Sequence, residues 1–273
     1  MITEVEFAAI SKEVIESLNA VLDHIRNNQV SEYILLLADG EYKEQLLNSL
    51  PKLEPYVIDS REDFYMDDTR VKFFIEFLKT FYSFPKTKNN QVDDSDVRQH
   101  MELMIYSHVW ESRPFLKRMY RMAILCSGGS YDWSVKVPPM GKHDFIRNEI
   151  RQRYQNNGFN LFQVIKNGYH SSLRNAFAHS EYSFDDQTKS IFLHNYGGEG
   201  WELNTISYND WSKRFCYSVL LAYHLIKITQ DRRQNIVNEL GTTMFQINHP
   251  RRKGDVLPTN IEYRPQHNSF NFR

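Results

Sequence analysis

The stretch Gly168–Asp185, GYHSSLRNAFAHSEYSFD, contains the point at which the chain changes from helical to strand periodicity. The Ala-Phe-Ala spacer at 176–178 is typical of a packed helix, whereas the residues after it alternate as they do in strands. The same stretch places Arg174, Asn175 and His179 on one short segment. It therefore predicts a helix that ends at a small sheet, with three polar groups beside its apolar spacer.

Helical patterns also fill the beginning of the chain. Thr3 and Glu6 have the spacing of a capping box, and an apolar stripe predicts an amphipathic helix over 3–27. Residues 31–50 are compatible with a helix or with a short buried strand followed by a helix, and we favour the helix. Residues 51–63 hold two prolines and a charged cluster, so a connection is expected there. Residues 1–60 thus predict an N-terminal helical region.

The rest of the chain predicts a mainly α fold with one sheet. Helical patterns cover 68–84, 97–129, 144–158, 160–179 and 211–240. Pro114 is expected to kink or split the second of these helices, and Asp210 to cap the last. A small antiparallel meander is predicted at 181–206, with strands at 182–184, 190–196 and 201–206 and turn formers at 185–189 and 197–200. Residues 249–273 show prolines, charge and no period, which predicts an irregular C-terminal tail.

Composition excludes several classes of protein. The 273 residues carry a net charge of −1, so a nucleic-acid partner would have to meet a local basic patch instead of a global field. Cys126 and Cys216 lie in apolar helical patterns, which favours buried thiols in a reducing cytosol over a disulfide. The N-terminus lacks a signal-like apolar core, and no run reaches the ~18 apolar residues of a membrane span. We expect a cytoplasmic protein without a membrane partner.

Spacing restricts how the three polar groups meet. On a helix, Asn175 and His179 are four apart and share a face, while Arg174 and His179 diverge by roughly 140°. They can converge if His179 lies where the helix ends, or if the arginine of one subunit meets the histidine of another. The spacing therefore favours a helix terminus at a dimer seam.

The segment LRNAFAH resembles the R-x4-6-H signature of the HEPN family, in the form with a polar residue directly after the arginine. The similarity extends to the element order over 68–240: a long helix with the acidic and aromatic stretch HVWESR comes before the motif helix, and a hairpin and a closing helix follow it. It does not include residues 1–60. The resemblance implies a HEPN-like up-and-down helical bundle with the meander inserted before the last long helix, a homodimer, and often a metal-independent endoribonuclease.

The resemblance also assigns roles. His179 would be the general acid or base, Arg174 would hold the scissile phosphate, and Asn175 would orient His179 or the phosphate. The expected products are a 2′,3′-cyclic phosphate and a 5′-hydroxyl end, and the setting would be a toxin or phage-defence system. The alternative for each residue is ordinary: a solvated cation, a backbone cap and the last polar residue before a turn.

Further residues could support this site. His170 shares the face of Arg174, and Glu111 either pairs locally with Arg113 or lines the site; a structural or supporting role is expected for both. The RNA-binding candidates, or simply a solvated helix face, are Arg147, Arg151, Arg153 and Tyr154. The histidines form neither H-x3-H nor H-E-x-x-H, and CSGGS lacks a following Gly-Lys-Ser/Thr, so neither a metal nor a cofactor is expected.

Two other functions remain open from the sequence. The chain could be a catalytically silent HEPN-type module that binds RNA, a nucleotide or a regulatory protein partner, or it could be a purely structural helical adaptor. Cleavage of RNA in the presence of EDTA distinguishes the enzyme from both.

Overall fold

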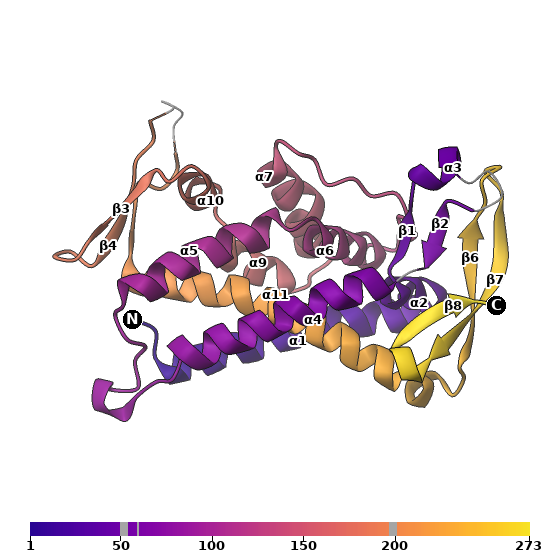
Figure 1. Ribbon diagram of the computed structural model, residues 1–273, viewed down its shortest axis with the longest axis horizontal. Coiled ribbons are helices and arrows are strands. Elements are labelled where there is room, and N and C mark those ends of the chain that lie inside the picture. The colour runs from indigo at the N-terminus through magenta and orange to yellow at the C-terminus, as the bar shows by residue number, and fades with distance from the viewer. Residues whose placement is uncertain (50–53, 59, 197–200) are drawn as a thin grey trace.

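The computed structural model describes residues 1–49, 54–58, 60–196 and 201–273, drawn as ribbon in Figure 1. The chain is mainly helical, as the sequence predicts. The helices are α1 (Glu4–Asn28), α2 (Val30–Ala38), α3 (Gln45–Ser49), α4 (Ser60–Phe81), η1 (Lys86–Lys88), α5 (Asp96–Glu111), α6 (Arg113–Cys126), α7 (Lys142–Asp144), η2 (Phe145–Arg151), α8 (Gln152–Asn156), α9 (Leu161–Gly168), α10 (Ser171–Ala178), α11 (Tyr208–Leu240) and η3 (Pro265–His267).

Short strands make three antiparallel sheets within the described ranges. The sheets are β1 (Gly40–Tyr42) with β2 (Tyr56–Ile58); β3 (Tyr182–Asp185), β4 (Ser190–Leu193) and β5 (Thr205–Ser207); and β6 (Met244–Pro250), β7 (Val256–Arg264) and β8 (Ser269–Phe272). The second sheet lies at one end of the long helices and the third at the other (Figure 1).

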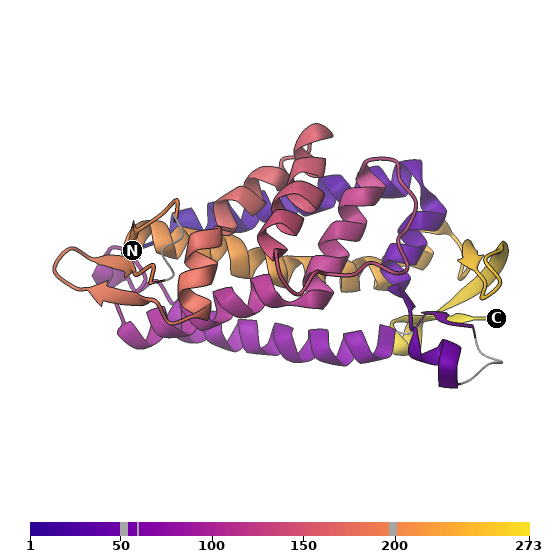
Figure 2. The ribbon, with the colours of Figure 1, turned by 90° about the horizontal axis from the view of Figure 1, so that it is seen from above.

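The long helix α11 is the axis of the bundle. It runs between α1 on one side and α4 and α5 on the other, as Figure 2 shows, and it packs on all three. Its middle, 218–222, is buried on all sides because other elements surround it, whereas the buried positions after it, from Leu225 to Ile236, recur at helical spacing. One hydrophobic core joins α1, α4, α5, α6, α9, α10 and α11.

The N-terminal region is mainly helical as predicted, but Gly40–Tyr42, inside the helix favoured over 31–50, and Tyr56–Ile58, inside the expected connection, pair as strands β1 and β2. Thr3 and Glu6 make the capping box that starts α1, with Thr3 Oγ1 accepting from the Glu6 N–H at 3.2 Å. The apolar run over 31–38 is helical, as favoured, and all of α2 from Tyr33 to Ala38 is buried. Because α1 packs along α11, residues 1–60 share one core with 68–240.

Pro114 splits the long helix predicted over 97–129. A proline inside a helix removes an N–H donor and clashes with the preceding turn. Here α5 ends at Glu111, Ser112 adopts an extended conformation, and α6 begins at Arg113 with the proline in its first turn. The predicted break is therefore a helix boundary instead of a kink.

The meander is an antiparallel sheet, as predicted, but its second strand ends at Leu193 and not at 196. Its register pairs Tyr182 with Leu193 and Ile191 with Ile206. The third strand starts at Thr205 and not at 201, and the turn predicted at 197–200 lies outside the described residues. Ser207, not Asp210, caps α11, because its Oγ accepts from the Asp210 N–H at 3.1 Å.

The C-terminal segment 249–273 is not an irregular tail. It supplies most of the sheet β6–β7–β8, whose inward side chains, such as Ile247, Ile261 and Phe270, are buried. Burial in β6 alternates residue by residue, which is the signature of a half-buried strand. Pro258 disfavours the prediction of a strand. In the structure it lies where β7 pairs with β6 alone, beyond the end of β8, and such a position tolerates a missing N–H.

Asp39 holds three helices together at the end of α2. Its backbone is left-handed (φ 49°), and its buried Oδ2 accepts from Arg118 Nη2 of α6 at 2.9 Å and from Arg233 Nη2 of α11 at 2.7 Å. Burial opposes ionisation of Asp39, but the two arginines outweigh it and lower the pKa of this carboxyl. The carboxylate therefore stays charged at neutral pH and pairs with two arginines that are themselves buried.

We expect Asp39→Asn to lower the free energy of unfolding by about 3–5 kcal/mol, because it leaves two buried arginines without their carboxylate. Asparagine tolerates the left-handed backbone, so the change isolates the charge. Urea denaturation measures the loss. Asp231→Asn, which breaks an exposed pair with Lys227, is the control and should cost about 0.5 kcal/mol or less. Equal effects of the two changes would contradict a structural role for the buried pair.

Candidate active site

The motif helix α10 is capped at both ends by histidines. At its start, Nδ1 of His170 accepts from the Ser172 N–H at 3.2 Å. At its end, His179 is the C-cap, with its N–H bonded to the Asn175 carbonyl, and Ser180 follows in a left-handed conformation. His179 therefore lies where the helix ends, but the helical pattern over 160–179 forms two helices, α9 and α10, with Tyr169 extended between them.

The buried face of α10 packs on α5. Phe177 meets the ring edges of Tyr106 and Trp211, with centroids 5.8 and 5.0 Å away. The Tyr106 hydroxyl accepts from the His170 N–H at 2.9 Å and donates to its carbonyl at 3.3 Å. These contacts hold both ends of the motif helix against α5.

α5 is itself anchored by a buried carboxylate. Glu102 is fully buried and accepts from the Tyr82 hydroxyl at 2.6 Å, from Trp211 Nε1 at 2.9 Å and from Arg98. Burial raises the pKa of Glu102 even though Arg98 favours the charged form. Because Tyr82 follows α4 and Trp211 belongs to α11, this group sets the position of α5 in the bundle.

Arg174 is held by Glu111 and Asn175. Its Nε donates to Glu111 Oε1 at 2.5 Å, Nη2 contacts the same oxygen, and Nη1 donates to Asn175 Oδ1 at 2.7 Å. A guanidinium has five N–H donors, so these three bonds leave two for a ligand. The fork is thus fixed in direction while it keeps donors for an anion.

Glu111 also binds Lys142 of α7, and that contact was not expected. Of the two alternatives for Glu111, a local pair with Arg113 or a place beside the motif residues, the structure shows the second, because Glu111 pairs with Arg174 and with Lys142. Partial burial opposes its ionisation, yet Lys142 and Arg174 outweigh this effect and lower the pKa of the carboxyl. Two cations thus share one carboxylate, so the group keeps a positive charge.

The structure brings together only part of the predicted triad. Asn175 Oδ1 faces Arg174. In the described part of the chain, neither Asn175 nor Arg174 hydrogen-bonds the His179 ring, so the expected contact from Asn175 to His179 is not formed. His179 is exposed, and its ring nitrogens have no partner within that same part. Its imidazole is therefore open to a substrate or to a second chain.

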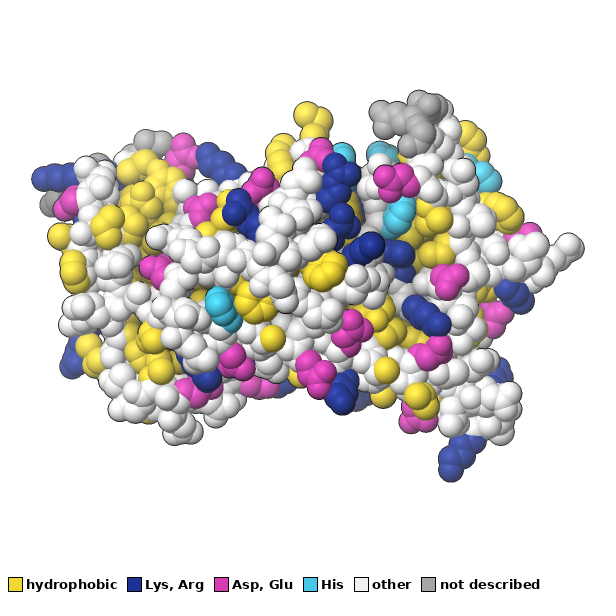
Figure 3. Space-filling model, turned by 180° about the vertical axis from the view of Figure 1, so that it is seen from behind, with side chains coloured by type: hydrophobic (Ala, Val, Ile, Leu, Met, Phe, Trp, Pro, Cys, Tyr) yellow, Lys and Arg dark blue, Asp and Glu magenta, His cyan; other side chains and the backbone are white. Residues whose placement is uncertain are grey.

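More basic side chains lie on the helices next to Arg174, Glu111 and Lys142. The π-helix η2 carries Arg147 and Arg151 beside α7, and burial together with the nearby Arg147 lowers the pKa of Arg151. Figure 3 shows Lys and Arg side chains gathered in a hollow in the upper middle of the face, where η2 and α10 lie. Arg147 and Arg153 reach carboxylates on their own helical stretch, Asp144 and Glu149.

Tyr154 does not belong to this surface. Its side chain is fully buried, and its hydroxyl donates to the Met119 carbonyl at 2.8 Å. A base cannot stack on a ring in that position, so the expectation that Tyr154 contacts RNA is wrong. The arginines on η2 and α8 remain candidates for phosphate contacts.

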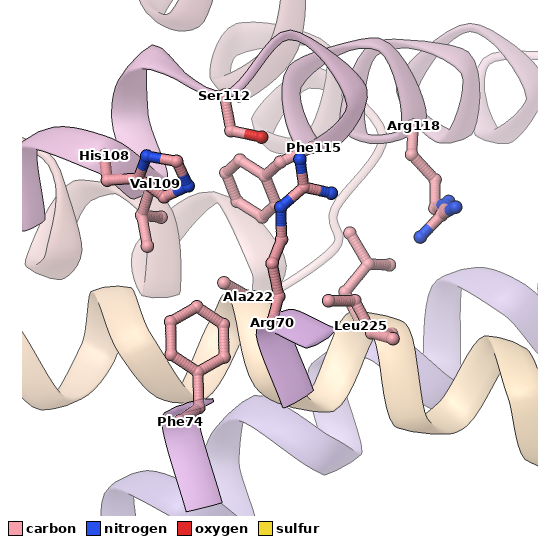
Figure 4. Close-up of a pocket in the computed structure, with 10 residues that line it drawn as sticks. Arg70, Phe74, His108, Val109, Ser112, Phe115, Arg118, Ala222 and Leu225 are labelled. Carbon is pink, nitrogen blue, oxygen red and sulfur yellow. The ribbon is translucent and has the colours of Figure 1, made fainter. Parts of the chain in front are cut away.

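A second feature, the narrow cavity of Figure 4, is too small for a substrate. It lies between α4, α5, α6 and α11, and its volume is about 20 Å³. Ser112 and Phe115 lie above it in this view, and Phe74 and Leu225 below it. That volume suits about one water molecule.

Both cysteines lie in the core of the protein. Cys126 and Cys216 are free and buried, as predicted. No helix in the described ranges is both long and apolar enough to cross a membrane. Within the same ranges, His, Cys, Asp and Glu form no group of three that could hold a metal ion.

A scan against protein-family models found no match to this chain, and searches of the curated proteins and of the solved structures found none either. The resemblance to the HEPN family therefore rests on the motif and on the element order along the sequence.

His170 should titrate below the ordinary histidine value of 6.5, because burial and Arg214 lower its pKa, only partly offset by Glu202. A neutral ring is required to cap α10, so the free energy of unfolding should fall as pH drops from about 6.5 towards the folded pKa. His170→Asn keeps a capping acceptor without titrating and should remove that part of the fall. NMR titration of the ring and urea denaturation at several pH values test this. A pKa of His170 above 6.5 would contradict it.

Proposed function

We propose that this protein is a metal-independent endoribonuclease of the HEPN type. The observation that carries the proposal is the motif helix: a held arginine fork with two donors left lies on α10, and an exposed histidine ends the same helix. The basic hollow around them supports an anionic substrate. Arg147, Arg151 and Arg153 would then contact phosphates along the strand.

The proposed reaction uses side chains alone for proton transfer. His179 accepts the proton of a ribose 2′-hydroxyl as its oxygen attacks phosphorus, and the bond from phosphorus to the 5′-oxygen breaks. The leaving oxygen takes up a proton, which gives a 2′,3′-cyclic phosphate and a 5′-hydroxyl end. Arg174 stabilises the charge that builds on the phosphate oxygens. Glu111 and Asn175 hold its guanidinium in direction.

A dimer completes this scheme. Each chain has one motif histidine, whereas the reaction needs a group that accepts a proton and one that donates it. His179 is exposed at the end of α10, where a second copy could supply the other imidazole. The active species is therefore proposed to be a homodimer.

The rival proposal is a silent HEPN-type module that binds RNA, a nucleotide or a regulatory protein. The ion pair of Arg174 with Glu111 favours it, because the carboxylate already occupies the side of the fork that a phosphate would use. For either function we propose a cytoplasmic site of action in a toxin or phage-defence system.

The central prediction concerns Arg174 and His179. Replacing either by alanine should reduce RNA cleavage by about 10²- to 10⁴-fold, since proton transfer and charge stabilisation each contribute that much. Cleavage by the parent should continue in excess EDTA and leave 2′,3′-cyclic phosphate ends. The measurement is the rate of cleavage of total RNA, with end-group determination of the fragments.

His267→Ala removes another exposed histidine, far along the chain in η3, and should cut like the parent. Undiminished cutting by His179→Ala would reject the mechanism. A parent that cuts no RNA would favour the silent module. Light scattering on the same samples tests the dimer, and an active monomer would contradict it.

Two variants of Glu111 distinguish its role in positioning Arg174 from the effect of its negative charge. Glu111→Ala should lower kcat by about tenfold or more, because Arg174 loses the acceptor that sets its direction. Glu111→Gln keeps an oxygen acceptor and should retain most of kcat, while KM for RNA falls because one negative charge is gone. Steady-state cleavage of a short RNA gives both constants. If both variants cut faster than the parent, Glu111 inhibits the site instead of positioning Arg174.

A further inference from the structure

A second basic site lies away from the motif helix, in a pocket between β1 and α6. Its volume is about 290 Å³, close to the ~300 Å³ at which ligand pockets begin. Among the described residues that line it, five carry positive charge and two carry negative charge. The RNase proposal above does not use this pocket, and the site stands or falls independently of it.

The cations form a row along α6. Arg113, Lys117 and Arg121 are spaced by four residues and so share one helix face. Eight residues of helix separate the first from the last, a rise of about 12 Å. The row is longer than a single phosphate group, so it fits an extended chain of negative charges.

The inner end of the row has a buried donor to spare. Arg121 is 4% exposed; its Nε donates to the Asp132 carbonyl at 2.9 Å, and its Nη2 to Glu41 at 2.9 Å and to the Trp133 carbonyl at 3.3 Å. Nη1 has no hydrogen-bond partner in the described part of the chain. A nearly buried guanidinium with an unused nitrogen at a cavity is typical of an anion site.

The outer end is open as well. Arg113 is exposed and makes neither a hydrogen bond nor an ion pair within the described ranges. It begins α6, whose N-cap Ser112 provides no side-chain cap, and Arg113 and Pro114 of its first turn line the pocket. The positive end of this helix therefore lies at the outer end of the row.

Glu41 limits the positive charge in the middle of the row. Its carboxylate accepts from Lys117 and from Arg121, and it stays partly exposed. Asp39, the other acid, is occupied by Arg118 and Arg233. Among the described residues, two carboxylates that each serve two cations leave a positive excess, which a partly enclosed cavity concentrates.

We propose that this pocket binds a small ligand with a di- or triphosphate chain. The chain lies along α6, with its inner phosphate on Arg121 Nη1 and its outer phosphate at Arg113 and the N-terminus of the helix. A concave pocket of this size favours a small molecule over the backbone of an RNA strand.

Calorimetry on the full chain in EDTA tests the site with ATP, pyrophosphate and adenosine as separate probes. ATP and pyrophosphate should bind and adenosine should not. The double change Arg113→Ala and Lys117→Ala should weaken ATP binding about tenfold or more, because charge-assisted hydrogen bonds are lost. The double change Lys72→Ala and Lys79→Ala removes equal charge from exposed positions on α4 and should have little effect.

Glu41→Gln should tighten ATP binding several-fold, because the amide keeps an acceptor while the repelling charge disappears. Circular dichroism checks that each variant is folded. Absence of ATP binding at millimolar concentration, equal losses in the two double variants, or adenosine binding as tight as ATP would overturn the proposal. The proposal would also be overturned if a short RNA bound, lost its binding in the Arg113 and Lys117 double variant, and ATP did not bind. The pocket would then contact a nucleic-acid backbone.

Discussion

The position of the candidate site depends on a carboxylate that water does not reach. A buried charge is stable only when it is paired and its lone pairs are used, and Glu102 meets that condition with Arg98, Tyr82 and Trp211. Its partners come from α5, from the end of α4 and from α11, so the geometry of the charge fixes three helices. Further along α5, Tyr106 contacts the N-cap of α10 and Glu111 binds Arg174 of that helix. Arg174 does not contact Glu102, but its position depends on Glu102 because that carboxylate sets the position of α5.

Holding the arginine and binding a phosphate make opposite demands on Glu111. A firm partner orders the guanidinium before the substrate arrives, which lowers the entropic cost of binding. The same partner neutralises the charge that should attract the substrate. Three features reduce the conflict: Lys142 shares the carboxylate, the pair is partly exposed so that water weakens it, and two N–H donors stay open. Glu111 can therefore position Arg174 while Arg174, Lys142 and Glu111 together keep a net positive charge.

Periodicity predicted the helices and the meander because each has a repeating face, and the end of α10 at His179 followed from the same pattern. It could not predict the contact of Lys142 with Glu111, because Lys142 lies 31 residues away and begins α7, which at three residues is too short to show a period. It also failed at Tyr154: the π-helix η2 has more residues per turn than an α-helix, so the face seen from the sequence shifts before α8 begins. The C-terminal sheet was missed because Pro250 ends β6 and Pro258 lies inside β7, and prolines disfavour the prediction of a strand.

One proline underlies both basic sites. Without Pro114 a single helix could continue from α5 through α6, and its backbone N–H groups at this point would be bonded internally. The break turns the middle of that helix into a start, with free N–H groups and no side-chain cap. Glu111 is the last residue before the break and Arg113 the first after it, so one faces Arg174 and the other the pocket on α6. Along the chain, only Ser112 thus separates a residue of the motif site, Glu111, from a residue of the pocket on α6, Arg113.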